Sequence, residues 1–179
     1  QPRVRYLARR SLRTALLYGL AVGSVLFSLA RPLGELLYHE PDAGTYLRLY
    51  APLVPLLYTD IVTDAICKGL GHQDANARYN LLTSFLDVAF LWYLLPRLGL
   101  GGYFLSFAVT HLVNFLLSFR RLVLVSGIRM DLSPVLRAAV CTVAAALAAE
   151  LLPQGSGALG LVLSGSCCLL LLLFLWTLL

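Results

Sequence analysis

Charged side chains are scarce in this sequence: Asp, Glu, Lys and Arg make up 13% of its 179 residues, whereas 59% are hydrophobic. Soluble domains contain about a quarter charged residues. A mean hydropathy of +0.81 is far more than a soluble core of this length requires. We therefore interpret the chain as an integral membrane protein. Its net charge of +5 is read as a determinant of membrane topology, and nucleic acid is not an expected partner.

Motifs for bond-breaking chemistry are also missing. The sequence has no Gly-rich phosphate loop, no Ser-His-Asp spacing and no metal-binding constellation. Its four cysteines fit neither a metal site nor a disulfide framework, and Cys167 and Cys168 lie inside an apolar run. We predict that the protein is not an enzyme and that it binds no cofactor.

Six apolar runs of 17 to 22 residues follow one another along the chain. A helix of about 20 residues crosses about 30 Å of hydrocarbon and leaves no backbone group unpaired in lipid. None of the runs alternates as a membrane β-strand does. The expected fold is an all-α, polytopic membrane helical bundle of about six transmembrane helices. The runs are 14–30, 47–67, 79–95, 103–119, 134–152 and 158–179.

Polar and glycine-rich segments separate these runs, and they predict the membrane topology. The segments are 39–44, 69–77, 96–102, 125–134 and 153–157. If the loops alternate between the two faces, 11 of the 14 Lys and Arg residues lie on one face. The positive-inside rule places that face, with both ends of the chain, in the cytoplasm. The basic start of the chain also fits a signal peptide, but the expected interpretation is a piece of a longer protein that begins in a cytoplasmic loop.

The second run contains two prolines and a row of ionisable residues. Pro52 and Pro55 each remove a backbone donor, so a kinked or interrupted helix is expected. Asp60, Asp64 and Lys68 are spaced four residues apart and share one helix face. Asp60 lies about 5 Å from the centre of the run, where a charge costs roughly 2.5–3.5 kcal/mol. Asp60 is therefore expected to face protein or water, while Asp64 and Lys68 fit either a structural ion pair or a gate.

The third and fourth runs carry further polar residues at helical spacing. Asn80, Thr83, Ser84 and Asp87 share one face of the third run. On the fourth run, His111 and Asn114 lie three residues apart, too few for a metal site. The polar face either lines an aqueous cavity beside Asp60 or supplies hydrogen bonds between helices.

Three segments of the chain resemble a known family of membrane transporters. They are residues 46–80, with the motif GLG at 69–71; residues 93–106, with the spacing P-x-x-G-x-x-G; and residues 111–123. They are similar to the C-terminal part of the stage V sporulation protein B group. That group consists of polysaccharide-biosynthesis flippases of the multidrug and oligosaccharidyl-lipid exporter (MATE/MOP) superfamily.

This resemblance implies a two-lobed transporter with six helices in each lobe and a central cavity that opens to alternate sides. Residues 1–125 would form the last four helices of the second lobe, and residues 126–179 two additional C-terminal helices. The implied function is export of a lipid-linked polysaccharide or a spore-cortex or other cell-envelope precursor across a bacterial plasma membrane. The implied partners are the lipid bilayer, the lipid-linked glycan and the remainder of the transporter.

Within this scheme, the membrane-embedded acids are the candidates for coupling transport to H⁺ or Na⁺. The candidate coupling and cavity residues are Asp60, Asp87, Asn80, Thr83 and Asn114. The candidate cytoplasmic gate consists of Asp64, Lys68 and Arg78. The alternatives are a drug or metabolite exporter on the same fold, a membrane-embedded glycan-processing enzyme and a structural membrane scaffold.

Overall fold

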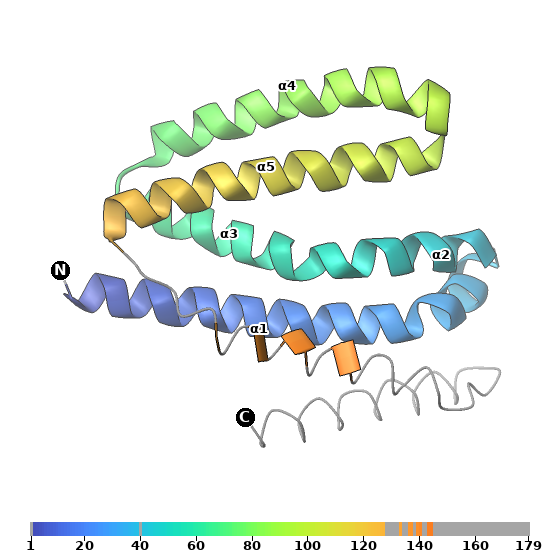
Figure 1. The fold of residues 1–179 in the computed structure, drawn as a ribbon, viewed down its shortest axis with the longest axis horizontal. Coiled ribbons are helices and arrows are strands. Elements are labelled where there is room, and N and C mark those ends of the chain that lie inside the picture. Colours follow the sequence, from blue (N-terminus) through green and yellow to red (C-terminus); the bar gives the residue numbers. More distant parts are fainter. Residues whose placement is uncertain are drawn as a thin grey trace. The chain divides into compact units, whose positions relative to one another are not determined.

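The computed structural model describes residues 2–39 and 41–127, together with residues 133, 136, 137, 139, 140, 143 and 144. Apart from short linkers, the described chain is helical and contains no β-strand, which confirms the predicted all-α class (Figure 1). The five α-helices are α1 (Pro2–Leu33), α2 (Pro41–Tyr50), α3 (Val54–Gly69), α4 (Gln73–Leu98) and α5 (Leu100–Ser126). A π-helical turn, Gly34–Tyr38, follows α1, and a 3-10 turn, Ala51–Leu53, joins α2 to α3.

Four helical segments in the described part are long and apolar enough to cross a membrane. They are Arg3–Leu33, Asp42–Gly69, Gln73–Leu98 and Leu100–Ser126. Each contains one of the first four predicted runs, so those four predictions are confirmed. The two further runs predicted at 134–152 and 158–179 lie, apart from a few isolated positions, outside the described residues.

The second of these segments is interrupted, as its prolines predict. A 3-10 turn at Ala51–Leu53 separates α2 from α3, and Pro52 lies within it. Since proline lacks the N–H that continues an α-helical ladder, the backbone tightens at this point.

Two predicted loops are shorter than the sequence indicated. The glycine-rich segment 69–77 is reduced to a linker, because α4 already begins at Gln73. At the other end, α4 continues through Pro96 to Leu98, and Gly99 alone separates it from α5. Gly99 adopts a φ of 57° and a ψ of −139°, which a residue with a Cβ rarely reaches, so the chain reverses within one residue.

The chain divides into two compact units. Among the described residues, the first comprises the chain up to Ala15 together with residues 56–127, and the second contains Leu16–Pro55. The buried core of the first unit combines residues from the start of α1, from α3 and from α5; its members are Ala8, Leu12, Cys67 and Leu122.

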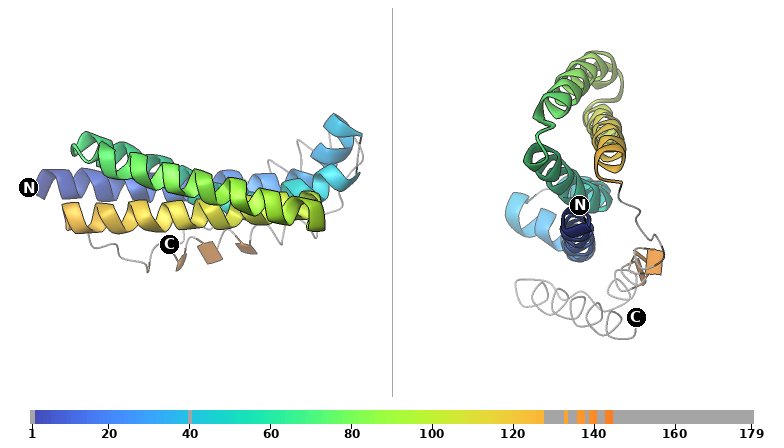
Figure 2. Two further views of the ribbon diagram at one scale, coloured as in Figure 1. Left: turned by 90° about the horizontal axis from the view of Figure 1, so that it is seen from above. Right: turned by 90° about the vertical axis from the view of Figure 1, so that its left-hand side faces the viewer.

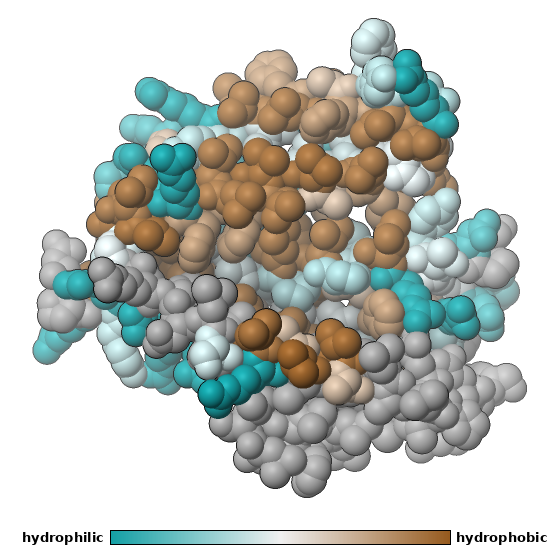
Figure 3. Space-filling view, viewed as in Figure 1, coloured by the Kyte–Doolittle hydropathy of each residue, from teal (hydrophilic) through white to brown (hydrophobic). Residues whose placement is uncertain are grey.

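In the first unit, α4 and α5 form a closely packed antiparallel hairpin (Figures 1 and 2). Gly102 permits the close approach, because a Cβ at this position would lie 2.7 Å from the carbonyl carbon of Leu94. Hydrophobic side chains gather over the middle of the hairpin, and hydrophilic ones lie toward its ends (Figure 3). The outward side of α4 is apolar, with Phe85, Val88 and Trp92 all exposed. This pattern is typical of a surface that faces lipid.

In the second unit, α1 packs against the segment around the 3-10 turn. A Cβ on Gly23 would lie 2.9 Å from the carbonyl oxygen of Ala51, so a small residue is needed here. The guanidinium of Arg48 lies 4.5 Å from the centroid of the Phe27 ring. The electron-rich face of the ring attracts the cation, and this attraction offsets part of the cost of placing the guanidinium in an apolar environment.

Candidate functional site

The polar side chains of α3, α4 and α5 meet inside the first unit. At the end of α3, the carboxylate of Asp64 accepts hydrogen bonds from the side-chain amides of Asn76 and Asn80, at 2.8 Å and 3.4 Å. Both amides belong to α4, so these hydrogen bonds join α3 to α4, and Asn76 is fully buried. The two amides of α4 bond the carboxylate of Asp64, and no ion pair between Asp64 and Lys68 is found among the described residues.

Asp60 lies one helical turn before Asp64 and bonds to α5. Its Oδ2 accepts a hydrogen bond of 3.0 Å from Nδ2 of Asn114. Its Oδ1 is buried and has no hydrogen-bond partner among the described residues. The Oδ1 of Asn114 faces the Thr83 hydroxyl of α4 at 3.4 Å, and this completes a chain of contacts over three helices. An acidic oxygen buried without a donor is costly, so Asp60 is the strained member of the site.

Asp87 is bonded within the hairpin. Its Oδ1 accepts hydrogen bonds from the hydroxyls of Ser106, at 2.7 Å, and Thr110, at 3.3 Å. Asp87 lies within about 3 Å of the midpoint of α4, at 1.5 Å per residue. The acid that the sequence places deepest in the third run therefore points toward α5 and not toward lipid.

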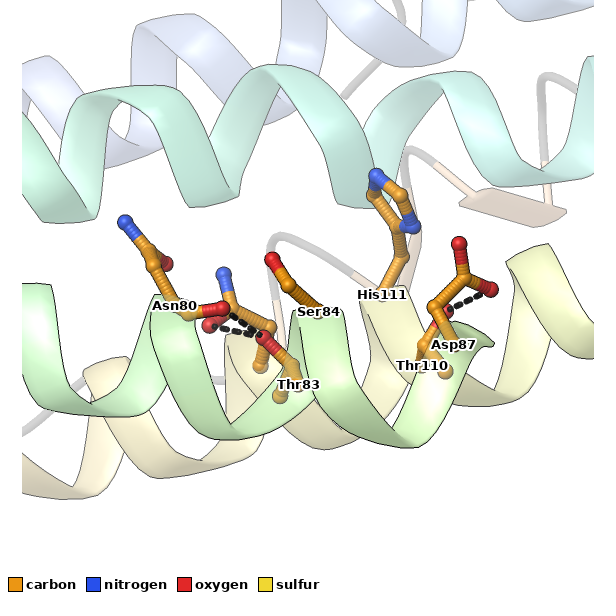
Figure 4. Close-up of a pocket in the computed structure, with 7 residues that line it drawn as sticks. Asn80, Thr83, Ser84, Asp87, Thr110 and His111 are labelled. Atoms are coloured by element: carbon orange, nitrogen blue, oxygen red, sulfur yellow. Dashed lines mark hydrogen bonds between the residues drawn. The ribbon is translucent and has the colours of Figure 1, made fainter. Parts of the chain in front are cut away.

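A cavity of about 190 Å³ opens beside these residues, and every residue that lines it is polar (Figure 4). The lining residues are Asn80, Thr83, Ser84, Asp87, Thr110, His111 and Asn114. At about 30 Å³ of liquid volume per water, the space accommodates several water molecules. The structure therefore brings together the predicted cavity residues of the third and fourth runs. The polar face of α4 lines a half-open cavity, which agrees with one of the two interpretations expected.

The imidazole of His111 is fixed at the cavity wall. Its Nδ1 lies 3.0 Å from the carbonyl oxygen of Phe107, and its ring stacks on the Phe107 ring with centroids 3.9 Å apart. A carbonyl only accepts, so Nδ1 carries the proton and Nε2 is left as an acceptor in the neutral ring. Asp60 is close enough to interact electrostatically with this imidazole.

None of the three acids forms an ion pair with Lys or Arg in the part of the chain that the structure describes. Each is bonded instead by neutral amides or hydroxyls. Neutral donors stabilise a carboxylate less than a bonded cation does, and they also tolerate its protonated form. The arrangement therefore suits acids that exchange a cation during the function of the protein.

The predicted gate residues are only partly brought together. Lys68 and Arg78 are both exposed, whereas Asp64 is bonded inward. The basic residue that does contact the linker between α3 and α4 is Arg121 of α5, whose guanidinium lies 3.4 Å from Nδ1 of His72. This contact was not predicted.

The sequence reasoning also missed the small polar residues of α5. Ser106, Thr110 and Ser118 are buried, and together with Asn114 they recur every four residues. A period of four places small polar side chains on one stripe of a helix, and this was the available signal. Asn76 gave no such signal, because it was assigned to a loop.

Among the described residues, no group of three or more His, Cys, Asp or Glu side chains is placed to hold a metal ion. Comparison with known proteins adds no assignment, since no protein-family model, no curated protein and no solved structure matches the chain.

Proposed function

We propose that the chain is part of a cation-coupled membrane transporter that moves a lipid-linked glycan precursor across a bacterial plasma membrane by alternating access. The observation that carries this proposal is the all-polar cavity between α4 and α5, with Asp87 in its wall and Asp60 bonded to Asn114 beside it. Ionisable groups inside membrane helices are rare and usually mark the path of an ion or substrate.

The position of the cavity supports transport more than a purely structural role. Asp87, His111 and Asn114 all lie within about 3 Å of the midpoints of their helices, at 1.5 Å per residue. Substrate and coupling-ion sites of transporters lie near the middle of the bilayer and often beside interrupted helices. The 3-10 interruption at Ala51–Leu53 belongs to the same membrane segment as Asp60. Hydrogen bonding alone does not require an open polar space of this size.

The resemblance to polysaccharide flippases supplies the proposed cargo and architecture. On this proposal, the described helices belong to the second of two lobes, and the remainder of the transporter completes the central cavity. The negative charges of Asp60 and Asp87 hold the coupling cation in the site, with Asn80, Thr83 and Asn114 as their neighbours. Asp64 ties α3 to α4 on the cytoplasmic side, where Lys68 and Arg78 face the aqueous phase.

The test replaces Asp60 and Asp87 by Asn, singly, in the full-length protein. The probe is a fluorescent polyprenyl-pyrophosphate-linked sugar in proteoliposomes, and a membrane-impermeant quencher reports its leaflet. Both variants are expected to lose most gradient-driven translocation, because Asn retains the shape of Asp but lacks its negative charge. Asp74→Asn, which alters an exposed acid on the first turn of α4, is the matched control and is expected to keep wild-type transport. Wild-type rates in both site variants, with intact folding, would remove these acids from the mechanism.

A drug or metabolite exporter on the same fold is the second candidate function. The observation that favours it is the charge of the cavity, whose wall contains one carboxylate and no Lys or Arg to hold a pyrophosphate. Competition separates the two candidates: a lipophilic cation that blocks translocation of the fluorescent probe, and is itself transported, would favour the exporter.

A further inference from the structure

We propose that His111 is the proton-accepting group of the cavity and that the coupling cation is therefore a proton. This inference rests on the proposed transport function and names its coupling ion. The cavity between α4 and α5 offers water access, a fixed imidazole and a nearby carboxylate within one all-polar space.

The first argument is the orientation of the imidazole. The bond from Nδ1 to the Phe107 carbonyl and the stacking on the Phe107 ring hold the side chain in one tautomer and one orientation. Nε2 is then the acceptor that remains in a ring lining the cavity. A nitrogen acceptor of this kind takes up a proton readily, whereas hard cations prefer oxygen ligands.

The second argument is the set of charges around the ring. Asp87 of α4 lines the cavity together with His111, Asp60 of α3 interacts electrostatically with the imidazole, and no Lys or Arg is among the lining residues. An imidazolium in this position is surrounded by acids and by neutral hydroxyl and amide groups. Among the described residues, the ring therefore has carboxylates as its charged neighbours in the cavity and no Lys or Arg that competes with them.

The third argument is the state of the oxygens of Asp87. Both hydroxyl hydrogen bonds to its carboxylate go to Oδ1. Oδ2 accepts none of the side-chain hydrogen bonds found among the described residues and is left for the water of the cavity. Asp87 and His111 line the same cavity, and Asn114 of its wall donates to Asp60.

The proposed step transfers one proton and no electrons. A hydronium ion in the cavity loses a proton to Nε2, so that one O–H bond breaks, one N–H bond forms and a neutral water remains. The imidazole becomes imidazolium, and the charge of the nearby acids balances it. Release reverses the step when the cavity opens to the other face of the membrane.

A direct test uses nuclear magnetic resonance of the full-length protein in lipid nanodiscs with ¹⁵N-labelled histidine. The described chain contains two other histidines, His39 and His72, and His→Gln variants assign each signal. His111 is expected to carry its proton on Nδ1 in the neutral ring and to gain a second proton on Nε2 when the sample is acidified. Exchange of choline chloride for sodium chloride at constant pH is expected to leave its signals unchanged. A ring protonated on Nε2 at high pH, a ring that does not titrate, or signals shifted by sodium would overturn the proposal.

A second test measures coupling with the fluorescent lipid-linked sugar in sodium-free proteoliposomes whose membrane potential is clamped at zero. A gradient of about one pH unit sustains about a tenfold asymmetry between leaflets for a cargo that moves with one proton. Wild type is expected to approach this ratio and His111→Gln to stay near equal distribution, while still equilibrating the probe. His72→Gln, outside the cavity, is the matched control and is expected to behave as wild type.

The outcomes of this test separate the inference from the function on which it rests. Accumulation by His111→Gln, or accumulation by wild type driven by sodium at constant pH, would overturn the proton assignment. A wild-type protein that fails to move the probe under every gradient tested would instead refute the flippase function. The histidine spectra would then decide the proton assignment alone.

Discussion

The side-chain amide of Asn114 donates a 3.0 Å hydrogen bond to Asp60, and this bond links α5 to α3 across 54 positions of the sequence. Asn114 bonds Oδ2 of Asp60, whereas Oδ1 of the same carboxyl group is buried and has no hydrogen-bond partner among the described residues. The stability of the three-helix arrangement is therefore expected to depend on this pair more than on the better-satisfied acids Asp64 and Asp87.

Replacement of Asn114 by Leu is expected to destabilise the protein by about 1–3 kcal/mol, because it leaves the carboxyl of Asp60 buried with no donor. Combining it with Asp60→Leu should recover part of the loss, since both polar partners are then removed. Thermal unfolding of the purified protein measures both effects. Ser84→Ala, on the same cavity but exposed, is the control and should change stability by less than about 0.5 kcal/mol. If Asn114→Leu behaves like Ser84→Ala, the bond is not structural.

The hairpin offers a pair of adjacent glycines with opposite expectations. Gly102→Ala places a Cβ against the backbone of Leu94 and should cost about 1–3 kcal/mol, because the helices must separate. Gly101→Ala meets no atom within 4 Å and should be neutral or stabilise α5 by up to about 1 kcal/mol. Urea titration of both variants against wild type checks the difference, and equal stabilities would contradict the close packing at Leu94.

Ser106→Ala is expected to weaken the packing of α4 on α5 by about 1.5–3 kcal/mol, the range for a hydrogen bond to a charged group. Ser106 is fully buried and provides the shorter of the two hydroxyl bonds to Asp87. Ser106→Thr keeps the hydroxyl and separates the lost bond from the change in side-chain volume. The effect should largely disappear in an Asp87→Leu background, and a full effect there would show that Ser106 acts by packing alone.

Thiol labelling tests the predicted topology in a protein that keeps Cys67 and has its other native cysteines replaced. Cys67 is 1% exposed and should resist maleimide unless the protein is unfolded. Lys68→Cys, one residue later and exposed, should react from the cytoplasmic face only. Arg97→Cys should react from the opposite face only. Reaction of both introduced thiols from the same face would refute the predicted alternation of loops.

Hydropathy was sufficient to predict the first four spans, because the cost of polar backbone in lipid leaves few alternatives to a helix. Helix ends were less predictable. The segment 73–77 is polar and was expected to be a loop, yet it begins α4, where the bond from Asn76 to Asp64 compensates for the burial of Asn76. The shared face of Asn80, Thr83 and Asp87 was visible in the spacing. Their partners on α5 were not, since the register of two helices depends on packing at positions such as Gly102.

The single-residue turn at Gly99 has a consequence for how the protein enters its membrane. The two helices have 26 and 27 residues, and no loop between them is long enough to remain in the aqueous phase while one helix inserts before the other. They are therefore best inserted as a preassembled hairpin. Asp87 then enters the hydrocarbon already bonded to Ser106 and Thr110, and this offsets part of the roughly 2.5–3.5 kcal/mol that a charge at the centre of a lone helix costs. Residues of the proposed transport site are thus expected to assist insertion as well, because α5 supplies the hydrogen bonds to the acid of α4.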